Sequence, residues 1–161
     1  MQKRKIAARL GCAIALALVA GGSAAQGRPS YGQEINLADA KSVAAGAIAE
    51  AKRNNWPVAI AIVDNHGFLV YFEKLDDTQS ASVNVAIEKA RTAAMFRRPS
   101  KAFETAVSKG RVAVLGLSGA MPITGGVPIV REGKVIGACG ASGVASEQDE
   151  QACEAGVKAL N

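Results

Sequence analysis

The amino-acid sequence predicts a single α+β domain in which helices cover an antiparallel sheet. Residues 58–64 and 68–72 are strand-type apolar runs on either side of a tight turn, and residues 126–131 and 134–139 flank a two-residue turn. The other apolar segments repeat at helical spacing and lie before, between and after these two hairpins. Strands that come in hairpin pairs favour an α+β arrangement over alternating parallel strands and helices.

The first two elements are predicted from periodicity and composition. Asn36 is placed to cap a helix over residues 37–54, whose apolar residues recur every three or four positions. The strand over residues 58–64 consists of Val, Ile and Ala until its final aspartate. A strand without polar alternation is expected to be covered on both faces.

The second half of the chain is predicted to be mainly helical around its hairpin. Residues 78–98 form a long helix and residues 100–109 a shorter one, with a proline between them. Residues 112–117 are apolar but lie between glycines, so their structure is left open. The last helix begins after Ser146, with Asp149 three residues on from Ser146 in the spacing of a capping box.

The first 25 residues have the layout of a secretory signal peptide. Residues 1–9 carry four positive charges and no acid, residues 10–20 are apolar, and small residues precede Ala25. The run of about 11 apolar residues is shorter than the roughly 20 that span a membrane, which disfavours an uncleaved anchor. We therefore expect a cleaved leader over residues 1–25, a mobile segment over 26–35, a domain over 36–161 with no membrane span, and a periplasmic or secreted location.

Charge and cysteine content restrict the partners of the protein. Four of the 19 basic residues lie in the predicted leader, which leaves 15 basic against 14 acidic residues, a net charge of +1. A nearly neutral protein has no electrostatic footprint for nucleic acid. Cys139 and Cys153 remain after cleavage. In an oxidising compartment they can form a disulfide, and otherwise they serve as small buried hydrophobes.

Side chains that carry chemistry are few. His66 is the only histidine, and the chain has neither a Cys-x-x-Cys nor a Gly-x-Ser-x-Gly motif, so it fits neither a structural zinc site nor a serine hydrolase. His66 lies at a hairpin tip, where an imidazole can ligate haem iron or another metal, or simply occupy a turn. Lys89 and Arg91 either bind a carboxylate or form a solvated helix face. Glycine-rich loops present backbone N–H groups to a ligand or only make tight turns, and their candidate residues are Thr124, Gly125, Gly126 and Ser142.

Taken together, these segments resemble a known family. The matching motifs are Val58–Asp64 followed by Gly67, Lys89–Ala93, Thr124–Ile129, Gly140–Gly143, and Asp149 with Glu150. In order and spacing they resemble the GlcG/HbpS-like family of haem-binding domains, which is related to the C-terminal domain of PduO-type corrinoid adenosyltransferases. The resemblance covers about residues 35–161.

The resemblance implies a profilin-like fold with a five-stranded antiparallel sheet, assembly into homo-oligomers, and a function in haem binding or haem handling. A corrinoid is the less expected ligand, because adenosylation needs ATP and suits an exported protein less well. The haem-ligating histidine that relatives carry in the first helix has no counterpart, since residues 37–55 contain no histidine. His66 is therefore the expected iron ligand on chemical grounds, with Met95 and Cys139 as weaker candidates.

A second function stays open at this point: cofactor-free lyase or isomerase chemistry on a small organic acid or aromatic compound. In that case Lys89 holds the carboxylate, and His66 or Asp64 moves a proton. A single histidine with no evident acid–base partner favours binding over catalysis. A third interpretation is an oligomer with a purely structural role, which would bind no ligand.

Overall fold

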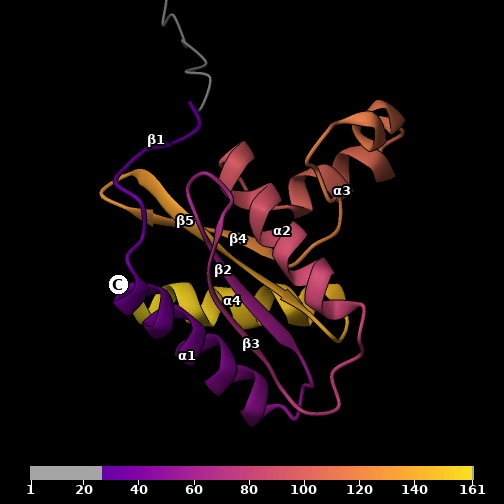
Figure 1. The fold of residues 1–161 in the computed structure, drawn as a ribbon. Helices are drawn as coiled ribbons and strands as arrows, with labels where there is room; N and C mark the ends of the chain where they lie inside the picture. The colour runs from indigo at the N-terminus through magenta and orange to yellow at the C-terminus, as the bar shows by residue number, and fades with distance from the viewer. Residues whose placement is uncertain (1–26, 161) are drawn as a thin grey trace, which may run out of the picture.

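The computed structural model describes residues 27–160 as a sheet with helices on both faces (Figure 1). The predicted signal peptide, residues 1–25, lies outside the described residues. The strands are β1 (Ser30–Tyr31), β2 (Ala59–Asp64), β3 (Leu69–Lys74), β4 (Gly126–Arg131) and β5 (Lys134–Ser142). The helices are α1 (Leu37–Arg53), α2 (Ser82–Phe96), α3 (Lys101–Ser108) and α4 (Ser146–Leu160), with a 3₁₀ helix η1 (Val112–Gly116).

Strand β5 is the centre of the sheet. Its residues 137–142 pair antiparallel with β2, which in turn pairs antiparallel with β3. On its other edge, residues 134–140 pair antiparallel with β4. The short strand β1 pairs parallel with residues 134 and 135. At residues 134 and 135 of β5, one edge of the strand is already paired with β4. Strand β1 therefore pairs with the opposite edge, the same edge that β2 pairs with further along β5.

The α+β class and the five strands are confirmed, but the prediction of a purely antiparallel sheet is wrong. Strand β1 runs parallel to β5. It is two residues long and lies in the polar segment 26–35, so neither length nor composition reveals it. Tertiary hydrogen bonds hold this segment: Gly32 N donates to Val135 O at 2.9 Å and Ile35 N donates to Ile136 O at 2.8 Å. The profilin-like classification stays a prediction.

Two apolar cores lie on opposite faces of the sheet. One is enclosed by α1 and α4 and the other by α2. Strand β2 contributes to both, because Ile60 and Ile62 belong to the first core while Ala59, Ala61 and Val63 belong to the second, all fully buried. This alternation confirms that the apolar run is covered on both faces.

Small residues allow α2 to approach the sheet closely. A Cβ added at Gly140 would overlap the carbonyl oxygen of Ala86 and lie 2.9 Å from the Cβ of Ala90. One added at Gly126 would overlap the carbonyl oxygen of Lys89. The helix therefore lies on bare backbone of β4 and β5, which brings Lys89 beside the glycine-rich loop.

The helix boundaries largely follow the prediction. The side chain of Asn36 caps α1, since its Oδ1 accepts the N–H of Asp39 at 2.9 Å. Helix α2 covers only residues 82–96 of the predicted 78–98, because residues 78–81 form turns and no regular helix. The segment that the sequence left open, residues 112–117, contains the 3₁₀ helix η1.

The start of α4 differs from the predicted capping box. Oδ2 of Asp149 binds Nζ of Lys89, and its Oδ1 accepts the N–H of Val144, two residues before the first residue of α4. The side chain that closes the first turn is Gln148, whose Oε1 accepts the N–H of Ala145 at 3.2 Å. The capping-box spacing correctly placed an acidic residue, Asp149, in the first turn of the helix. It did not identify the partner of Asp149 in the folded protein.

A disulfide joins the central strand to the last helix. Cys139 of β5 and Cys153 of α4 are bonded, with their Cα atoms 5.5 Å apart. Both residues are fully buried in the core beneath α1 and α4. Of the two states that the sequence allowed for these cysteines, the structure has the bonded one.

Candidate functional site

The structure separates the predicted site residues into an interior group and a surface group. The interior group lies between α2, the loop before β4 and the end of β5, and it comprises Lys89, Thr124, Gly125, Gly126 and Ser142. The surface group comprises His66 and Arg91, at the β2–β3 turn and the part of α2 behind it.

Lys89 is directed into the protein. Its side chain is 2% exposed, and its Nζ lies 2.8 Å from Oδ2 of Asp149 and 3.1 Å from the carbonyl oxygen of Ala141. A buried ammonium group needs such partners because it has lost its hydration. Nζ of Lys89 therefore binds groups of the protein itself, and its role in holding a substrate carboxylate stays a prediction.

Asp149 is the partner that sequence reasoning missed. It is 60 residues from Lys89 in the chain and lies on α4, so no local spacing links the two residues. Its Oδ1 also accepts the N–H of Val144 at 3.3 Å. Burial raises the pKa of Asp149 above its ordinary value, although the hydrogen bond and charge of Lys89 act in the opposite direction.

The glycine-rich loop uses its polar groups within the protein. The N–H of Thr124 donates to Oε2 of Glu104 at 2.7 Å, and the Thr124 hydroxyl donates to the same oxygen. The N–H of Gly126 donates to Oγ of Ser100 at 2.9 Å. These groups therefore attach the loop to α3 and its N-cap.

Gly125 and Ser142 complete the interior group. Gly125 has φ +126°, and a Cβ added to it would lie 2.9 Å from Nζ of Lys89. Ser142 is buried, and its hydroxyl lies 3.2 Å from that of Ser82. The interior group thus joins helices to the sheet through its own hydrogen bonds, and its role in ligand binding stays a prediction.

The β2–β3 turn places the only histidine on the surface. Oδ1 of Asp64 accepts the N–H groups of His66 at 2.8 Å and Phe68 at 2.9 Å, so this carboxylate shapes the turn. Gly67 has φ +89°, a backbone conformation that favours glycine. The side chains of His66 and Phe68 are exposed on either side of it.

Helix α2 lies directly behind this turn. Nε of Arg91 donates to the carbonyl oxygen of Gly67 at 3.2 Å, and its Nη1 lies 2.6 Å from Oε1 of Glu88. A Cβ added at Gly67 would lie 3.2 Å from Sδ of Met95, whose side chain is 44% exposed. The imidazole and the thioether that the sequence names as iron ligands therefore share one region of the surface.

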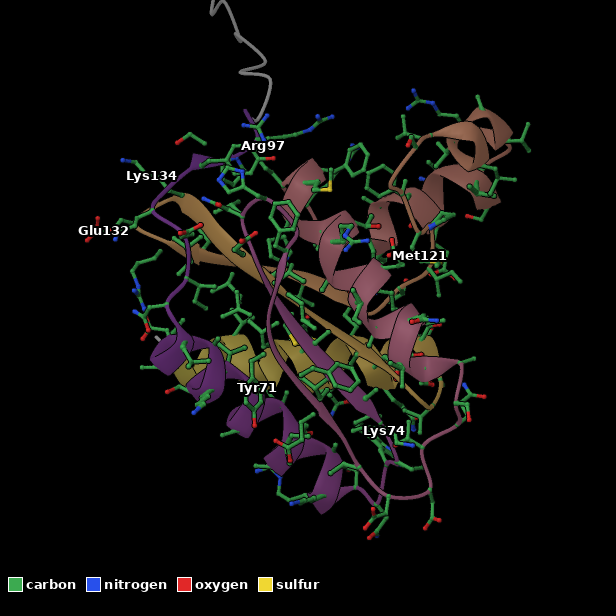
Figure 2. All side chains as sticks on the ribbon, viewed as in Figure 1. Tyr71, Lys74, Arg97, Met121, Glu132 and Lys134 are labelled. Carbon is green, nitrogen blue, oxygen red and sulfur yellow. A yellow bond between two sulfur atoms is a disulfide. The ribbon has the colours of Figure 1, made fainter. Side chains whose placement is uncertain are left out.

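The N-terminal segment completes this region. The hydroxyl of Tyr31 donates to the carbonyl oxygen of Met95 at 2.7 Å, and the Arg97 guanidinium lies 5.1 Å from the centre of the Tyr31 ring. Figure 2 shows Arg97 beside the segment that leads into β1. We call this region the turn–helix surface and define it by Tyr31, His66, Phe68, Arg91, Met95 and Arg97. It combines exposed apolar side chains with two cations.

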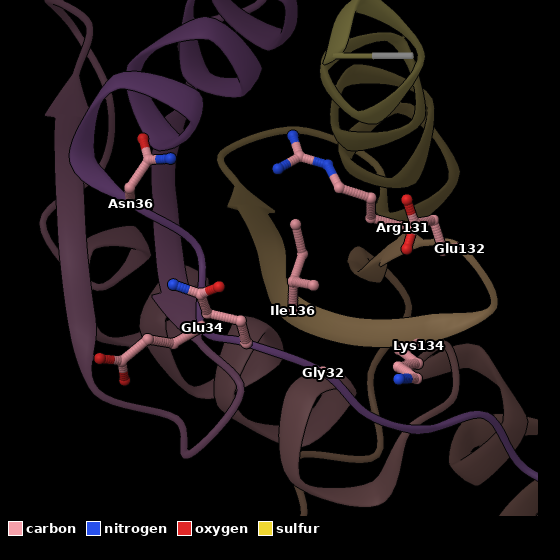
Figure 3. Close-up of a pocket in the computed structure, with 8 residues that line it drawn as sticks. Gly32, Glu34, Asn36, Arg131, Glu132, Lys134 and Ile136 are labelled. Carbon is pink, nitrogen blue, oxygen red and sulfur yellow. The ribbon is translucent and has the colours of Figure 1, made fainter.

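A separate groove lies between residues 32–36 and the β4–β5 turn (Figure 3). Its volume is about 330 Å³, and its lining includes two cations, Arg131 and Lys134, and two carboxylates, Glu34 and Glu132. Charges of both signs are therefore balanced there. The groove contains none of the site residues that the sequence predicts.

Residues 27–160 contain neither a membrane span nor a group of protein side chains suited to a metal ion. None of the helices in this range is long and apolar enough to cross a bilayer. Its His, Cys, Asp and Glu side chains form no group of three or more that could hold a metal.

Comparison with known proteins agrees with the motifs found in the sequence. The model of the family described as haem degrading protein HbpS-like matches residues 35–158. The chain belongs to the HbpS-like family. This HbpS-like chain is 40% identical to protein GlcG of Escherichia coli (strain K12) over 103 residues, which are 64% of this chain and 77% of GlcG.

The relation to PduO is also confirmed. The HbpS-like chain is 32% identical over 120 residues to the corrinoid adenosyltransferase PduO of Citrobacter freundii, covering 71% of this chain and 36% of PduO. A solved structure of a PduOC–haem complex has a TM-score of 0.72 and 26% identity, covering 80% of this chain and 96% of that one. A crystal structure of HbpS, with a TM-score of 0.75 and 23% identity over 82% of this chain and 94% of that one, shares the fold.

Proposed function

We propose that this HbpS-like protein is an exported haem-binding protein and that it binds haem at the turn–helix surface. The observation that carries the proposal is the shared location of His66 and Met95, two side chains that can ligate iron. The family and the PduOC–haem complex support haem as the ligand class. A corrinoid has no comparable support from the site.

The residues of the turn–helix surface fit the chemistry of haem. A porphyrin needs apolar contact for its faces, and Phe68, Met95 and Tyr31 are 69%, 44% and 46% exposed. Its propionates need cations, which Arg91 and Arg97 supply. His66 is held away from the protein interior by the turn, so its imidazole is free to ligate iron. When bound, haem would contribute an iron that exchanges electrons and small ligands.

The test is a titration of the purified protein with hemin, followed by absorbance in the Soret region. We expect saturable binding at low micromolar hemin. In His66→Ala the Soret band should shift and the affinity should fall about tenfold, because a ligand to iron is lost. Met95→Leu and Phe68→Ala should weaken binding less, through lost contacts. Lys52→Ala, at the far end of α1, is the control and should bind as the wild type does.

The proposal fails if hemin binding does not saturate. If binding saturates but is unchanged in His66→Ala, Phe68→Ala and Met95→Leu alike, haem binding stands and the turn–helix surface is not its site. These two outcomes separate the ligand from the location.

Export is supported by two independent features. Residues 1–25 have the signal-peptide layout, and the Cys139–Cys153 disulfide is of a kind that persists in oxidising compartments. Expression in a bacterial host followed by intact-mass measurement of the periplasmic fraction tests this part. We expect a chain that begins at Gln26, and a full-length chain retained in the cytoplasm would contradict export.

We also propose that the protein forms homo-oligomers through α3 and η1. These elements project from the layered body (Figure 1), and Val112, Leu115 and Leu117 there are 64%, 63% and 42% exposed. Apolar groups gathered in this way favour burial against a second copy. Light scattering after size exclusion should give a multiple of the chain mass, reduced in Leu115→Ser. A monomeric wild type would contradict this.

A further inference from the structure

A second groove lies between the C-terminal end of α1 and the loop that follows β3. Its volume is about 320 Å³, and its lining includes Lys52, Trp56, Leu75, Asp76 and Asp77. Figure 2 shows Lys74, the last residue of β3, far from Arg97 of the turn–helix surface. The groove is therefore separate from the proposed haem site, and its size suits a small ligand.

Trp56 supplies the aromatic part of this groove. The side chain is half-buried: it packs against the core beneath α1 and α4, and it also lines the groove. The N–H of Trp56 donates to the carbonyl oxygen of Ala51 at 2.9 Å, which attaches its backbone to the end of α1. Among aromatic side chains, tryptophan attracts an organic cation most strongly.

Two carboxylates line the same groove without a partner in the protein. Asp76 and Asp77 are exposed, and the ion pairs and side-chain hydrogen bonds of residues 27–160 involve neither of them. The loop that carries them is held in place, because Leu75 N donates to Val58 O at 3.0 Å and Oγ1 of Thr78 donates to Leu75 O at 2.7 Å. Such fixed negative charges raise the local concentration of cations.

Lys52 gives the groove one positive charge. Its side chain is exposed and takes part in none of the ion pairs of the described residues, so it neutralises neither Asp76 nor Asp77 by direct contact. Two negative charges and one positive charge leave a net charge of −1, which disfavours an anion. A ligand with both signs of charge can direct its carboxylate to Lys52 and its cationic group to the aspartates.

Core packing explains only part of this arrangement. It accounts for the buried part of Trp56, and exposed aspartates are common on protein surfaces. It does not account for a cavity in which an indole and two unpaired carboxylates lie together. An organic cation is the ligand that fits both kinds of group, because its charge is attracted by the carboxylates and by the indole ring.

We propose that the groove lined by Trp56, Asp76 and Asp77 binds a small organic cation that carries a quaternary ammonium group. The methyl groups of such a cation contact the indole, and the two carboxylates balance its charge. A metal ion fits less well, because the His, Cys, Asp and Glu side chains of residues 27–160 form no group of three or more that could hold one. The proposal does not depend on haem binding.

The test is a titration of the purified protein with choline chloride and, in a second series, with glycine betaine. Because Trp56 is the only tryptophan of the chain, its fluorescence reports on the groove directly. We expect a saturable change in emission with at least one of the two compounds, and no saturable change with sodium chloride at the same concentrations. Binding should weaken about tenfold in the double variant Asp76→Asn with Asp77→Asn. Asparagine tolerates the φ of +61° at residue 77, so the loop is preserved.

A second variant tests the aromatic contact. Trp56→Leu, measured by calorimetry because its fluorescence is lost, should also weaken binding about tenfold. Glu154→Gln removes an exposed carboxylate on α4 and is the matched control, which should bind as the wild type does. Tighter binding of choline identifies a simple cation as the ligand. Tighter binding of glycine betaine, with the advantage lost in Lys52→Gln, identifies a zwitterion.

Two results would overturn the proposal. One is that neither compound binds saturably. The other is that the double aspartate variant and Trp56→Leu both bind like the wild type. Because Asp76 and Asp77 are exposed, their variant should fold even if Trp56→Leu does not. Hemin binding is measured separately and does not enter these outcomes.

Discussion

At the scale of single residues, Lys89 and Asp149 show how burial changes the meaning of a charged side chain. Each is 2% exposed, and their polar atoms lie 2.8 Å apart. An ion pair removed from water is stable only while both partners are present, because either charge alone is left without hydration. The pair therefore constrains the packing of α2 against α4 more than it adds to stability.

We predict that Lys89→Met lowers the free energy of unfolding by about 3–5 kcal/mol, because it leaves Asp149 buried and unpaired. The double variant Lys89→Met with Asp149→Leu should recover most of this loss, since it removes both charges. Urea denaturation of the three proteins at pH 7 measures the effect. A double variant as unstable as the single one would show that the pair itself provides the stability.

We also predict that the loss of stability in Lys89→Met depends on pH. The pKa of Asp149 is raised in the folded protein, so the folded state binds this proton more strongly than the unfolded state does. That contribution to stability is present at acid pH and is lost as the pH rises from the ordinary value of about 3.9 through the folded-state value. Without Lys89 the pKa rises further, so the deficit of Lys89→Met should shrink between pH 7 and pH 4.5. An equal deficit at both pH values would contradict this.

At the scale of elements, the contact between α2 and β5 depends on residues without side chains. Gly140 lies against the backbone of Ala86, and a methyl group there would overlap the helix. The abundance of Ala, Val and Gly in the sequence indicates such close approach. It does not identify which glycine faces which helix, because that depends on the register of β5.

We predict that Gly140→Ala lowers the free energy of unfolding by about 3 kcal/mol, because the helix must move away from the sheet to admit the methyl group. Gly116→Ala is the control, since nothing lies within 4 Å of its added Cβ. Thermal denaturation followed by circular dichroism compares them. Similar melting temperatures for both variants would exclude close packing as the cause.

The β4–β5 turn permits a stabilising change. Glu132 and Gly133 have φ values of +51° and +72°, as a type I′ turn requires, and glutamate tolerates this conformation poorly. Glu132→Asn should therefore raise the free energy of unfolding by about 0.5–1 kcal/mol. Glu132→Gln removes the same charge without the backbone preference and should change little. Equal stabilisation by both variants, measured in urea, would assign the effect to charge.

At the scale of the whole molecule, the disulfide links the centre of the sheet to the last helix. Cys139 and Cys153 are 14 residues apart in the chain, and closing a loop of this size restricts the unfolded state. The link therefore stabilises the layered arrangement without adding any contact at the surface.

We predict that replacing both cysteines by alanine lowers the free energy of unfolding by about 3 kcal/mol. Reduction of the wild type with dithiothreitol should lower it by a similar amount, while the double variant should not respond to the reductant. A thiol assay on the denatured mature protein should find no free thiol before reduction. Detection of two free thiols before reduction would contradict the bond.

The sequence determined the four helices, the two hairpins and the family, because these depend on local patterns. Hairpin turns, helical periodicity and the Asn36 cap act over a few residues, and motif order identifies a relative without any structure. The same local information indicated His66 and Arg91, which the fold brings to one surface.

Only the tertiary structure decided which side chains reach solvent and which partners they meet. Lys89 looks like a ligand-binding cation in the chain, but the closeness of α2 to β5 buries it against Asp149. Strand β1 exists because β5 offers an unpaired edge beyond β2, which no property of residues 26–35 reveals. Contacts between residues far apart in the chain depend on packing in three dimensions, and local propensity carries no information about them.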